Sequence, residues 1–207
     1  MSDKNIILIG YSGHGLVVAD TALENSFNII GYCEKSALAL NPLNLEYLGW
    51  EADESFEGWE LDAGFIIGIG DNRLREKIYF TIIQRGKKFI SLINKSSSIS
   101  AYSEYGNGIF VNRNVSINAF VTIGDNVILN TGCIIEHGCK IESHVHVAPG
   151  AVLAGNVFVG ERTFIGANAI VKQGIKIGKD VIVGAGSVVL SDIPDGKKIV
   201  GNPNRYI

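Results

Sequence analysis

An aliphatic residue recurs at every sixth position of this chain from residue 99 to residue 189. Fifteen of these sixteen positions carry Ile, Leu or Val, and Tyr105 is the exception. The position four residues further on is mostly small or β-branched, as at Val115, Cys133 and Ala151. A period of six matches neither an α-helix, at about 3.6 residues per turn, nor a simple strand, at about 2. It is typical of a parallel β-helix, in which each hexad forms one side of a triangular coil.

Three hexads complete a coil of about 18 residues, so the repeat predicts roughly five stacked coils. The aliphatic residue is expected to point inward, with the small residue beside it. Gly, Asn and Asp are expected at the corners, because they tolerate left-handed backbone. Cys133 and Cys139 both fall on the small position. We therefore predict that these two cysteines are buried structural residues and not metal ligands.

The first part of the chain has a different pattern, in which apolar strands alternate with helices. Strands are expected at residues 5–10, 29–33, 65–69 and 89–93, with helices at residues 16–25 and 72–85. Such alternation predicts a small Rossmann-like α/β domain with a parallel sheet. The domains are therefore expected to be residues 1–94 and residues 95–207, the second being the β-helix with a C-terminal tail. The stretch 34–62 is poorly patterned and receives no function.

A glycine-rich turn, Gly10-Tyr-Ser-Gly-His-Gly15, follows the first predicted strand. Such a turn can present backbone N–H groups and a helix N-terminus to a phosphate. Its order is not the G-x-G-x-x-G of dinucleotide sites, and a lone turn of this kind is often only a tight connection. Glu34 ends the second strand, where it could bind ribose hydroxyls, and Gly70 follows the third. These loops lie at one edge of the predicted sheet, so we expect a nucleotide-binding crevice there.

Composition excludes several functions. The net charge is −3 and no cluster of Lys and Arg stands out, so nucleic-acid binding has no electrostatic support. No apolar run has the roughly 20 residues of a membrane-spanning helix, and the N-terminus does not resemble a signal peptide. A cytoplasmic location is therefore expected.

The whole chain resembles the bacterial nucleotide-sugar N-acetyltransferases of the bacillosamine pathway and their sialic acid O-acetyltransferase relatives, which are hexapeptide-repeat acyltransferases. The segments that carry the likeness are Gly10-Tyr-Ser-Gly-His-Gly15, Gly68-Ile-Gly-Asp-Asn72, Asn130-Thr131, Ile135-Glu-His137, His146-Val-Ala-Pro-Gly150, Ala154-Gly-Asn156 and Val200-Gly-Asn-Pro203. The resemblance implies a left-handed β-helix, acetyl-CoA as co-substrate, no metal, and a homotrimer with active sites between subunits.

The resemblance also implies roles for matching residues. His137 matches the general base, with Glu136 beside it, and His146 matches a histidine that contacts acetyl-CoA. The positions matching the sugar and nucleotide sites are Ser12, Gly13, His14, Glu34, Lys35, Gly70 and Asn130. The positions on later coils that match the pantetheine and adenine sites are Gly155, Ala167 and Ala185.

One position departs from the family. An acidic residue commonly follows the catalytic histidine, and here that residue is Gly138. Glu136 or a carboxylate from elsewhere is expected to orient His137 instead. His144, three residues into its hexad, is expected to point outward as a solvated or interface residue. A metal site built from His137, His144 and His146 is the weaker alternative, because it would leave the first domain without a purpose.

The expected function is acetyl transfer from acetyl-CoA to the amino group of a nucleotide-linked amino sugar, with His137 as general base and direct attack on the thioester. UDP-4-amino-4,6-dideoxy-N-acetylglucosamine is the expected acceptor. The alternatives are a GDP- or dTDP-linked amino sugar, O-acetylation of a sialic acid, and a non-catalytic protein that binds sugar nucleotides.

Overall fold

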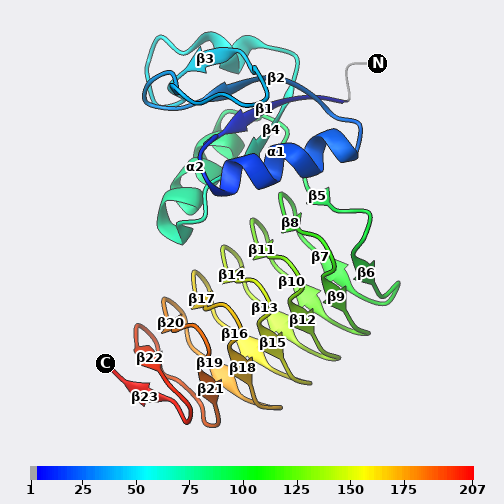
Figure 1. The fold of residues 1–207 in the computed structure, drawn as a ribbon, viewed down its shortest axis with the longest axis vertical. Coiled ribbons are helices and arrows are strands. Elements are labelled where there is room, and N and C mark those ends of the chain that lie inside the picture. Colours follow the sequence, from blue (N-terminus) through cyan, green and yellow to red (C-terminus); the bar gives the residue numbers. More distant parts are fainter. Residues whose placement is uncertain (1–3) are drawn as a thin grey trace. The chain divides into compact units, whose positions relative to one another are not determined.

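The computed structural model describes residues 4–207 and divides into two compact units, with the boundary between Leu92 and Ile93. This boundary lies two residues before the one expected from the sequence. Figure 1 shows an α/β unit at the N-terminal end of the chain and a β-helix at the C-terminal end. Each unit has its own buried apolar cluster.

The first unit is built on a four-stranded parallel sheet with the strand order β3-β2-β1-β4. Its elements are β1 (Asn5–Ile9), α1 (His14–Glu24), β2 (Asn28–Cys33), β3 (Tyr47–Gly49), the 3₁₀ helix η2 (Glu57–Glu60), β4 (Gly64–Ile67) and α2 (Asn72–Gln84). The central strand β1 is buried along Ile6–Ile9, as expected for a parallel strand covered on both faces. The predicted Rossmann-like sheet is confirmed.

The fourth strand of this sheet is not the predicted one. Residues 89–93 were expected to complete the sheet, but Phe89 makes only an isolated bridge to Phe65. The strand β5 (Leu92–Ile93) belongs to a sheet of the β-helix. The fourth strand is β3, which pairs with β2 from within the stretch 34–62. Three residues are too few to show a period of two, so the sequence pattern did not reveal β3.

The two helices begin in different ways. Asp71 caps α2, because its side chain accepts a hydrogen bond of 2.8 Å from the N–H of Leu74. α1 follows Gly13, which has a φ of 43° and provides no side-chain cap. The first N–H groups of α1 are therefore not satisfied by a capping side chain.

The second unit consists of short parallel strands in three sheets. Sheet I has the order β23-β22-β20-β17-β14-β11-β8-β5, sheet II has the order β21-β18-β15-β12-β9-β6, and sheet III has the order β19-β16-β13-β10-β7. Paired residues such as Thr122 and Lys140 lie 18 positions apart, which is the expected length of one coil. The chain passes through sheets I, II and III in turn, so the predicted triangular β-helix is confirmed (Figure 1).

The strands of the β-helix have the following bounds. They are β6 (Ser98–Ile99), β7 (Glu104–Tyr105), β8 (Phe110–Val111), β9 (Ser116–Ile117), β10 (Thr122–Ile123), β11 (Ile128–Leu129), β12 (Ile134–Ile135), β13 (Lys140–Ile141), β14 (His146–Val147), β15 (Val152–Leu153), β16 (Phe158–Val159), β17 (Phe164–Ile165), β18 (Ile170–Val171), β19 (Lys176–Ile177), β20 (Ile182–Val183), β21 (Val188–Val189), β22 (Lys198–Val200) and β23 (Arg205–Tyr206). β23 runs antiparallel to β22 and closes the C-terminal end of sheet I.

The repeated aliphatic residue is the second residue of its strand in all sixteen hexads from β6 to β21. From Val111 to Val189 each of these residues is buried, at 2% exposure or less. Ile99 is only partly buried, and Tyr105, the one departure from the aliphatic pattern, is 47% exposed. Cys133 and Cys139 are buried in the same core and unpaired, as predicted.

Each corner of the β-helix between residues 108 and 186 uses one residue in the left-handed region. These residues recur every sixth position from Gly108 to Gly186. Most are Gly or Asn, which adopt this conformation at low cost. Phe120 is an exception, because it has a φ of 61° and a ring that is 71% exposed. A bulky side chain in this region is strained, and its exposure leaves little packing to offset the strain.

We predict that a Phe120→Asn variant is more stable than a Phe120→Ala variant by about 1 kcal/mol. Both variants lose the contact between the Phe120 and Tyr102 rings, whose centroids lie 5.6 Å apart. They differ in how well the new residue tolerates the left-handed backbone. Chemical denaturation of both variants tests this, and equal free energies of unfolding would contradict the strain at this corner.

Candidate active site

The glycine turn after β1 allows three backbone segments to pack closely. A Cβ atom on Gly15 or on Gly68 would collide with the carbonyl oxygen of Gly10. Gly10 itself has a φ of 86°, which favours glycine. These glycines therefore have a structural role, because they let the start of α1 and the end of β4 approach the end of β1. The spacing of the glycines in this turn is therefore explained by backbone packing alone.

Ser12 and Gly13 are the open part of this turn. Both are exposed, and an added Cβ on Gly13 would meet no atom within 4 Å. They lie at the N-terminus of α1, where the helix dipole and uncapped N–H groups favour an anion. The predicted phosphate-binding position is thus accessible in the α/β unit.

His14 is the first residue of α1 and is partly buried. Burial lowers the pKa of His14 to about 4, and the positive charge of Arg75 contributes to the shift. The guanidinium of Arg75 is itself buried and donates a hydrogen bond of 3.1 Å to the carbonyl oxygen of Gly70. Arg75 therefore ties the Gly70 loop to α2, and its charge adds to the effect of burial in lowering the pKa of His14.

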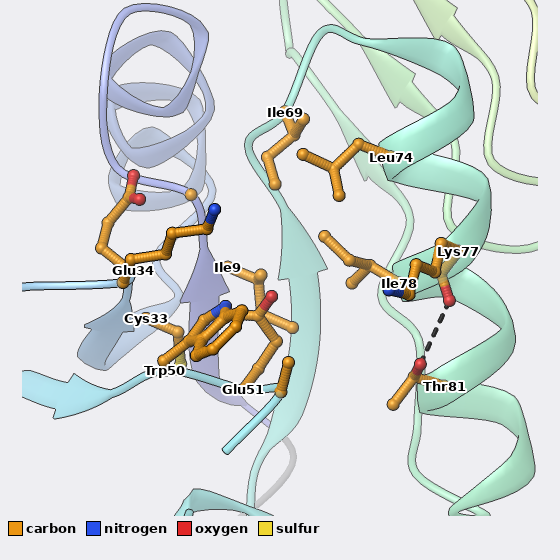
Figure 2. Close-up of a pocket in the computed structure, with 13 residues that line it drawn as sticks. Ile9, Cys33, Glu34, Trp50, Glu51, Ile69, Leu74, Lys77, Ile78 and Thr81 are labelled. Atoms are coloured by element: carbon orange, nitrogen blue, oxygen red, sulfur yellow. Dashed lines mark hydrogen bonds between the residues drawn. The ribbon is translucent and has the colours of Figure 1, made fainter.

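A cavity of about 250 Å³ opens at the carboxyl ends of β1, β2 and β3 (Figure 2). Ile9, Ile69, Leu74 and Ile78 form much of its apolar lining. Its charged lining residues are Glu34, Lys35, Glu51 and Lys77. The structure thus brings the predicted residues Glu34 and Lys35 to one cavity, where the sequence predicted a crevice for a nucleotide.

Two predicted residues in this cavity have defined partners. Oε1 of Glu34 accepts a hydrogen bond of 2.9 Å from the N–H of Tyr11, so the carboxylate also braces the glycine turn. Nζ of Lys35 lies 5.6 Å from the ring centroid of Trp50, a cation–π distance. Trp50 and Glu51 were not predicted, because the stretch that contains them has no periodic pattern. They directly follow β3, which is itself too short to be detected in the sequence.

His137 lies in the β-helix, at the corner that connects β12 of sheet II to β13 of sheet III. It is exposed, whereas the neighbouring Ile135 and Cys139 are buried. Gly155 is the equivalent residue of the next coil. An added Cβ on Gly155 would lie 2.5 Å from Nε2 of His137, so the imidazole rests against the Gly155 backbone.

No carboxylate supports His137 within residues 4–207 of a single chain. Glu136 makes no hydrogen bond to the imidazole. Gly138 has a φ of 66°, and an added Cβ there would collide with the side-chain oxygen of Asn156. The Glu136–His137 pair expected from the sequence is therefore not hydrogen bonded in one chain, and the role of Glu136 stays a prediction.

Asn130 and His146 form a second cluster, on sheet I and the corner that follows it. Nδ2 of Asn130 lies 3.4 Å from Nε2 of His146. Oδ1 of Asn130 accepts a hydrogen bond of 2.9 Å from Asn112. The ring of His146 is 7% exposed and packs edge-on against Phe164. These contacts fix the orientation of the Asn130 and His146 side chains, which were predicted to bind the sugar and acetyl-CoA.

The predicted residues of the β-helix occupy two different corners. Asn130, Ala167 and Ala185 lie along the corner between sheets I and II, whereas His137 and Gly155 lie along the corner between sheets II and III. Sheet II separates the two corners of one chain. The structure therefore groups the predicted residues into two sets and does not bring them together within one chain.

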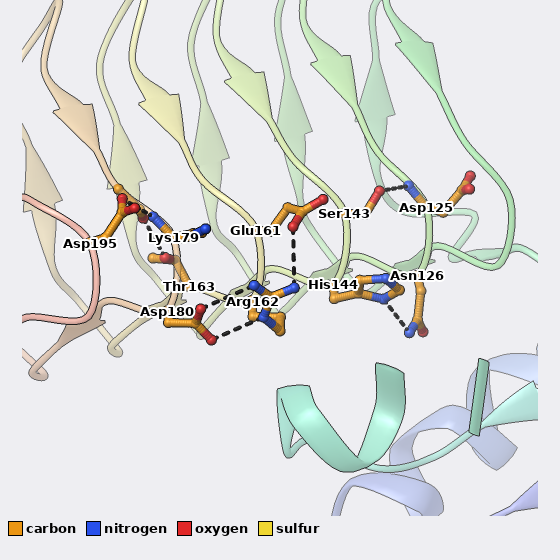
Figure 3. Close-up of polar contacts among 11 residues, drawn as sticks. Asp125, Asn126, Ser143, His144, Glu161, Arg162, Thr163, Lys179, Asp180 and Asp195 are labelled. Carbon is orange, nitrogen blue, oxygen red and sulfur yellow. Dashed lines mark hydrogen bonds and ion pairs between the residues drawn. The ribbon is translucent and has the colours of Figure 1, made fainter. Parts of the chain in front are cut away.

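His144 does not point into solvent as predicted. It is 4% exposed, has a φ of 63°, and its Nδ1 lies 2.9 Å from Nδ2 of Asn126 (Figure 3). Along the same corner, Arg162 makes two ion-pair contacts of 3.0 Å with Asp180 of the next coil. The left-handed backbone directs these side chains along the corner toward the neighbouring coil, which explains the error.

Residues 4–207 contain no group of three His, Cys, Asp or Glu side chains that could hold a metal ion. Among the helices of the described residues, none has the length and hydropathy needed to span a membrane.

The lowered pKa of His14 predicts a pH effect on stability. The folded state disfavours the proton, so its contribution to stability is present above the reference pKa of 6.5 and is lost as the pH falls toward about 4. A His14→Gln variant should lose less free energy of unfolding than the wild type over this interval. Denaturant titrations at several pH values test this, and equal losses in both proteins would contradict it.

Comparisons with known proteins agree with this architecture. Residues 5–82 match the PglD N-terminal domain. Residues 120–155 match the bacterial transferase hexapeptide of six repeats, and residues 156–191 match the hexapeptide repeat of succinyl-transferase.

Solved structures match over nearly the full length. The acetyltransferase domain of PglB from Neisseria gonorrhoeae FA1090, in complex with acetyl coenzyme A, is 30% identical with a TM-score of 0.92, covering 99% of this chain and 100% of that one. PerB from Caulobacter crescentus, in complex with CoA and GDP-perosamine, is 32% identical with a TM-score of 0.91, covering 98% and 97%. WeeI from Acinetobacter baumannii AYE, at 24% identity and a TM-score of 0.83, supports the fold alone. The chain belongs to the family of hexapeptide-repeat acyltransferases that join a PglD-type N-terminal domain to a left-handed parallel β-helix.

Proposed function

We propose that this chain transfers the acetyl group of acetyl-CoA to the amino group of a nucleotide-linked amino sugar. The observation that carries the proposal is an exposed histidine on the β-helix of a chain whose α/β unit has a cavity of about 250 Å³ at the carboxyl ends of its strands. The relatives support both substrates, because one was crystallised with acetyl-CoA and another, a GDP-perosamine N-acetyltransferase, with CoA and GDP-perosamine.

His137 is the proposed general base. The acceptor amine attacks the thioester carbonyl, its proton passes to the imidazole, and the carbon–sulfur bond breaks to release CoA. Imidazole suits this step because it can accept a proton near neutral pH. The contact with Gly155 supports the assignment, since it holds the ring on the side of the later coils.

Gly155 is the proposed donor to the developing oxyanion. Its N–H makes no hydrogen bond within residues 4–207, although it lies beside the His137 imidazole. A fixed backbone N–H at the point where negative charge develops lowers the barrier without reorganisation. The base and the oxyanion donor would then come from equivalent positions of two successive coils.

The two separate sets of β-helix residues support a homotrimer with active sites between subunits. One side of sheet II carries Asn130, His146, Ala167 and Ala185, and the corner at its other side carries His137. A corner of one copy placed against the opposite corner of its neighbour would bring both sets to one thioester. The trimer implied by the resemblance would therefore bring together two sets of predicted residues that lie apart in a single chain.

The acceptor is the least defined part of the proposal. The sequence resemblance favours UDP-4-amino-4,6-dideoxy-N-acetylglucosamine, and GDP- and dTDP-linked amino sugars are alternatives. O-acetylation of a sialic acid would use the same base but would leave the cavity of the α/β unit without a role. An acetyl-transfer assay over UDP-, GDP- and dTDP-amino sugars and free sialic acid distinguishes these acceptors. A cytoplasmic location stays a prediction.

We predict that a His137→Gln variant loses acetyl-transfer kcat by at least about 100-fold, because proton transfer by a positioned side chain contributes on the order of 10²–10⁴. Its affinity for acetyl-CoA, measured by calorimetry, should change little. Steady-state kinetics with saturating substrates test the first part. Full activity in this variant would refute the base assignment, and failure of the wild type to bind acetyl-CoA would favour a non-catalytic protein.

A Gly155→Ala variant should lose about 10- to 100-fold in kcat, because the new Cβ displaces the His137 imidazole by roughly 1 Å. Stability should be nearly unchanged, since the displaced group is the end of a side chain and Gly155 is not in the left-handed region. The control is the double variant with His137→Gln, in which the added methyl group should cost little further activity. If Gly155→Ala costs the same factor in kcat with and without His137→Gln, Gly155 does not act through His137.

A further inference from the structure

The short strand β3 places Glu51 at the same edge of the sheet as the predicted nucleotide loops. Gly49, the last residue of β3, pairs with Cys33, the last residue of β2. The N–H of Glu34 donates a hydrogen bond of 3.1 Å to the carbonyl oxygen of Gly49. Trp50 and Glu51 therefore follow the end of β3 at the edge of the sheet where Glu34 and Lys35 follow the end of β2. All four residues line the cavity.

Glu51 is a buried carboxylate in a largely apolar part of this cavity. It is 9% exposed, and Figure 2 shows it among the lining residues, beside Trp50 and near Ile9. Burial raises the pKa of Glu51, and the negative charge of Glu34 adds to the rise. Hydrogen bonds from its own backbone and from the Trp50 side chain oppose this shift, as does the charge of Lys35. A charge in this position is costly unless a ligand brings further N–H donors.

The other charged residues of the cavity are suited to different parts of a nucleotide. Glu34 braces the glycine turn next to the exposed Ser12 and Gly13, so it lies on the phosphate and ribose side. Lys35 lies over the ring of Trp50, and Lys77 lies on α2. Glu51 is the acidic lining residue that remains to bind the base.

The hydrogen-bonding edges of the nucleobases differ in how well they match a carboxylate. Guanine presents two adjacent donors, N1–H and the N2 amino group, which can bind both carboxylate oxygens. Uracil and thymine present a single N–H between two carbonyl oxygens, so the second carboxylate oxygen would face a lone pair. Adenine and cytosine each present an amino group next to a ring nitrogen that is an acceptor. A carboxylate thus favours guanine over the other bases.

We propose that Glu51 binds the N1–H and N2 amino groups of guanine, so that the acceptor is a GDP-linked amino sugar. The inference rests on the proposed function, because it takes the cavity as the nucleotide site. It selects the alternative nucleotide over the UDP sugar that the sequence resemblance favours. Glu51 is then a specificity-determining residue that takes no part in acetyl transfer.

Calorimetric titration of the full chain with GDP, UDP, dTDP and ADP tests the proposal. A bidentate pair of this kind discriminates between bases by on the order of 10- to 100-fold, so the wild type should bind GDP that much more tightly than the other three. UDP or dTDP binding as tightly as GDP would overturn the proposal, and so would the absence of measurable GDP binding. ADP controls for the size of a purine.

A Glu51→Gln variant provides the second arm. The amide keeps the shape of the side chain but offers one acceptor and one donor, which match the N3–H and O4 of uracil. The variant should lose about 10-fold or more in GDP affinity and gain in UDP affinity. The matched control is Glu54→Gln on the same loop, an exposed residue that does not line the cavity and should keep the preference for GDP. An unchanged preference in Glu51→Gln would overturn the assignment.

These binding measurements are independent of acetyl transfer. Selective GDP binding without transfer to any amino sugar would refute the proposed function and leave the nucleotide assignment standing. Transfer to UDP-linked acceptors in preference to GDP-linked ones would refute the nucleotide assignment and support the proposed function. Should Glu51→Gln not fold, as judged by circular dichroism, the comparison of the four nucleotides on the wild type still decides the question.

Discussion

The parallel stacking of 18-residue coils is the constraint on which the β-helix depends. Because each strand pairs with the strand one coil further on, residues 18 apart form a column on the surface. The chemistry of the site follows these columns, since Gly155 lies against His137, and Asn130 accepts a hydrogen bond from Asn112. An inward aliphatic residue in each hexad keeps the coils in register, so a side chain on a corner has defined neighbours above and below.

The sequence predicted most of the fold because both units have strong periodic signals. The hexad register was correct for every strand from β6 to β21, and three of the four strands of the α/β sheet, β1, β2 and β4, were found. The prediction failed where the pattern is too short to detect. β3 has three residues and was missed, and residues 89–93 are apolar enough to resemble a strand although Phe89 makes only one bridge.

The candidate site was less predictable, because its geometry depends on pairs that a linear pattern does not identify. The spacing of 18 between His137 and Gly155 is visible in the sequence, but the contact of the imidazole with the glycine backbone is not. His144 was predicted to be exposed because its left-handed backbone, which turns the side chain along the corner, could not be foreseen for a histidine. Glu51 was overlooked because a buried carboxylate in an unpatterned segment has no sequence signature.

The two thiols of the β-helix bear on the proposed direct transfer, because a covalent acyl-enzyme would require a nucleophile. A cysteine nucleophile reacts as the thiolate, which requires a low pKa and access to the substrate. Burial raises the pKa of Cys133 to about 12, and it also raises that of Cys139, whose thiol donates a hydrogen bond to the carbonyl oxygen of Ala154. Both side chains point into the aliphatic core, away from the exposed His137. Neither thiol is therefore placed to attack a thioester at the surface, which agrees with the proposed direct transfer of the acetyl group with His137 as the base.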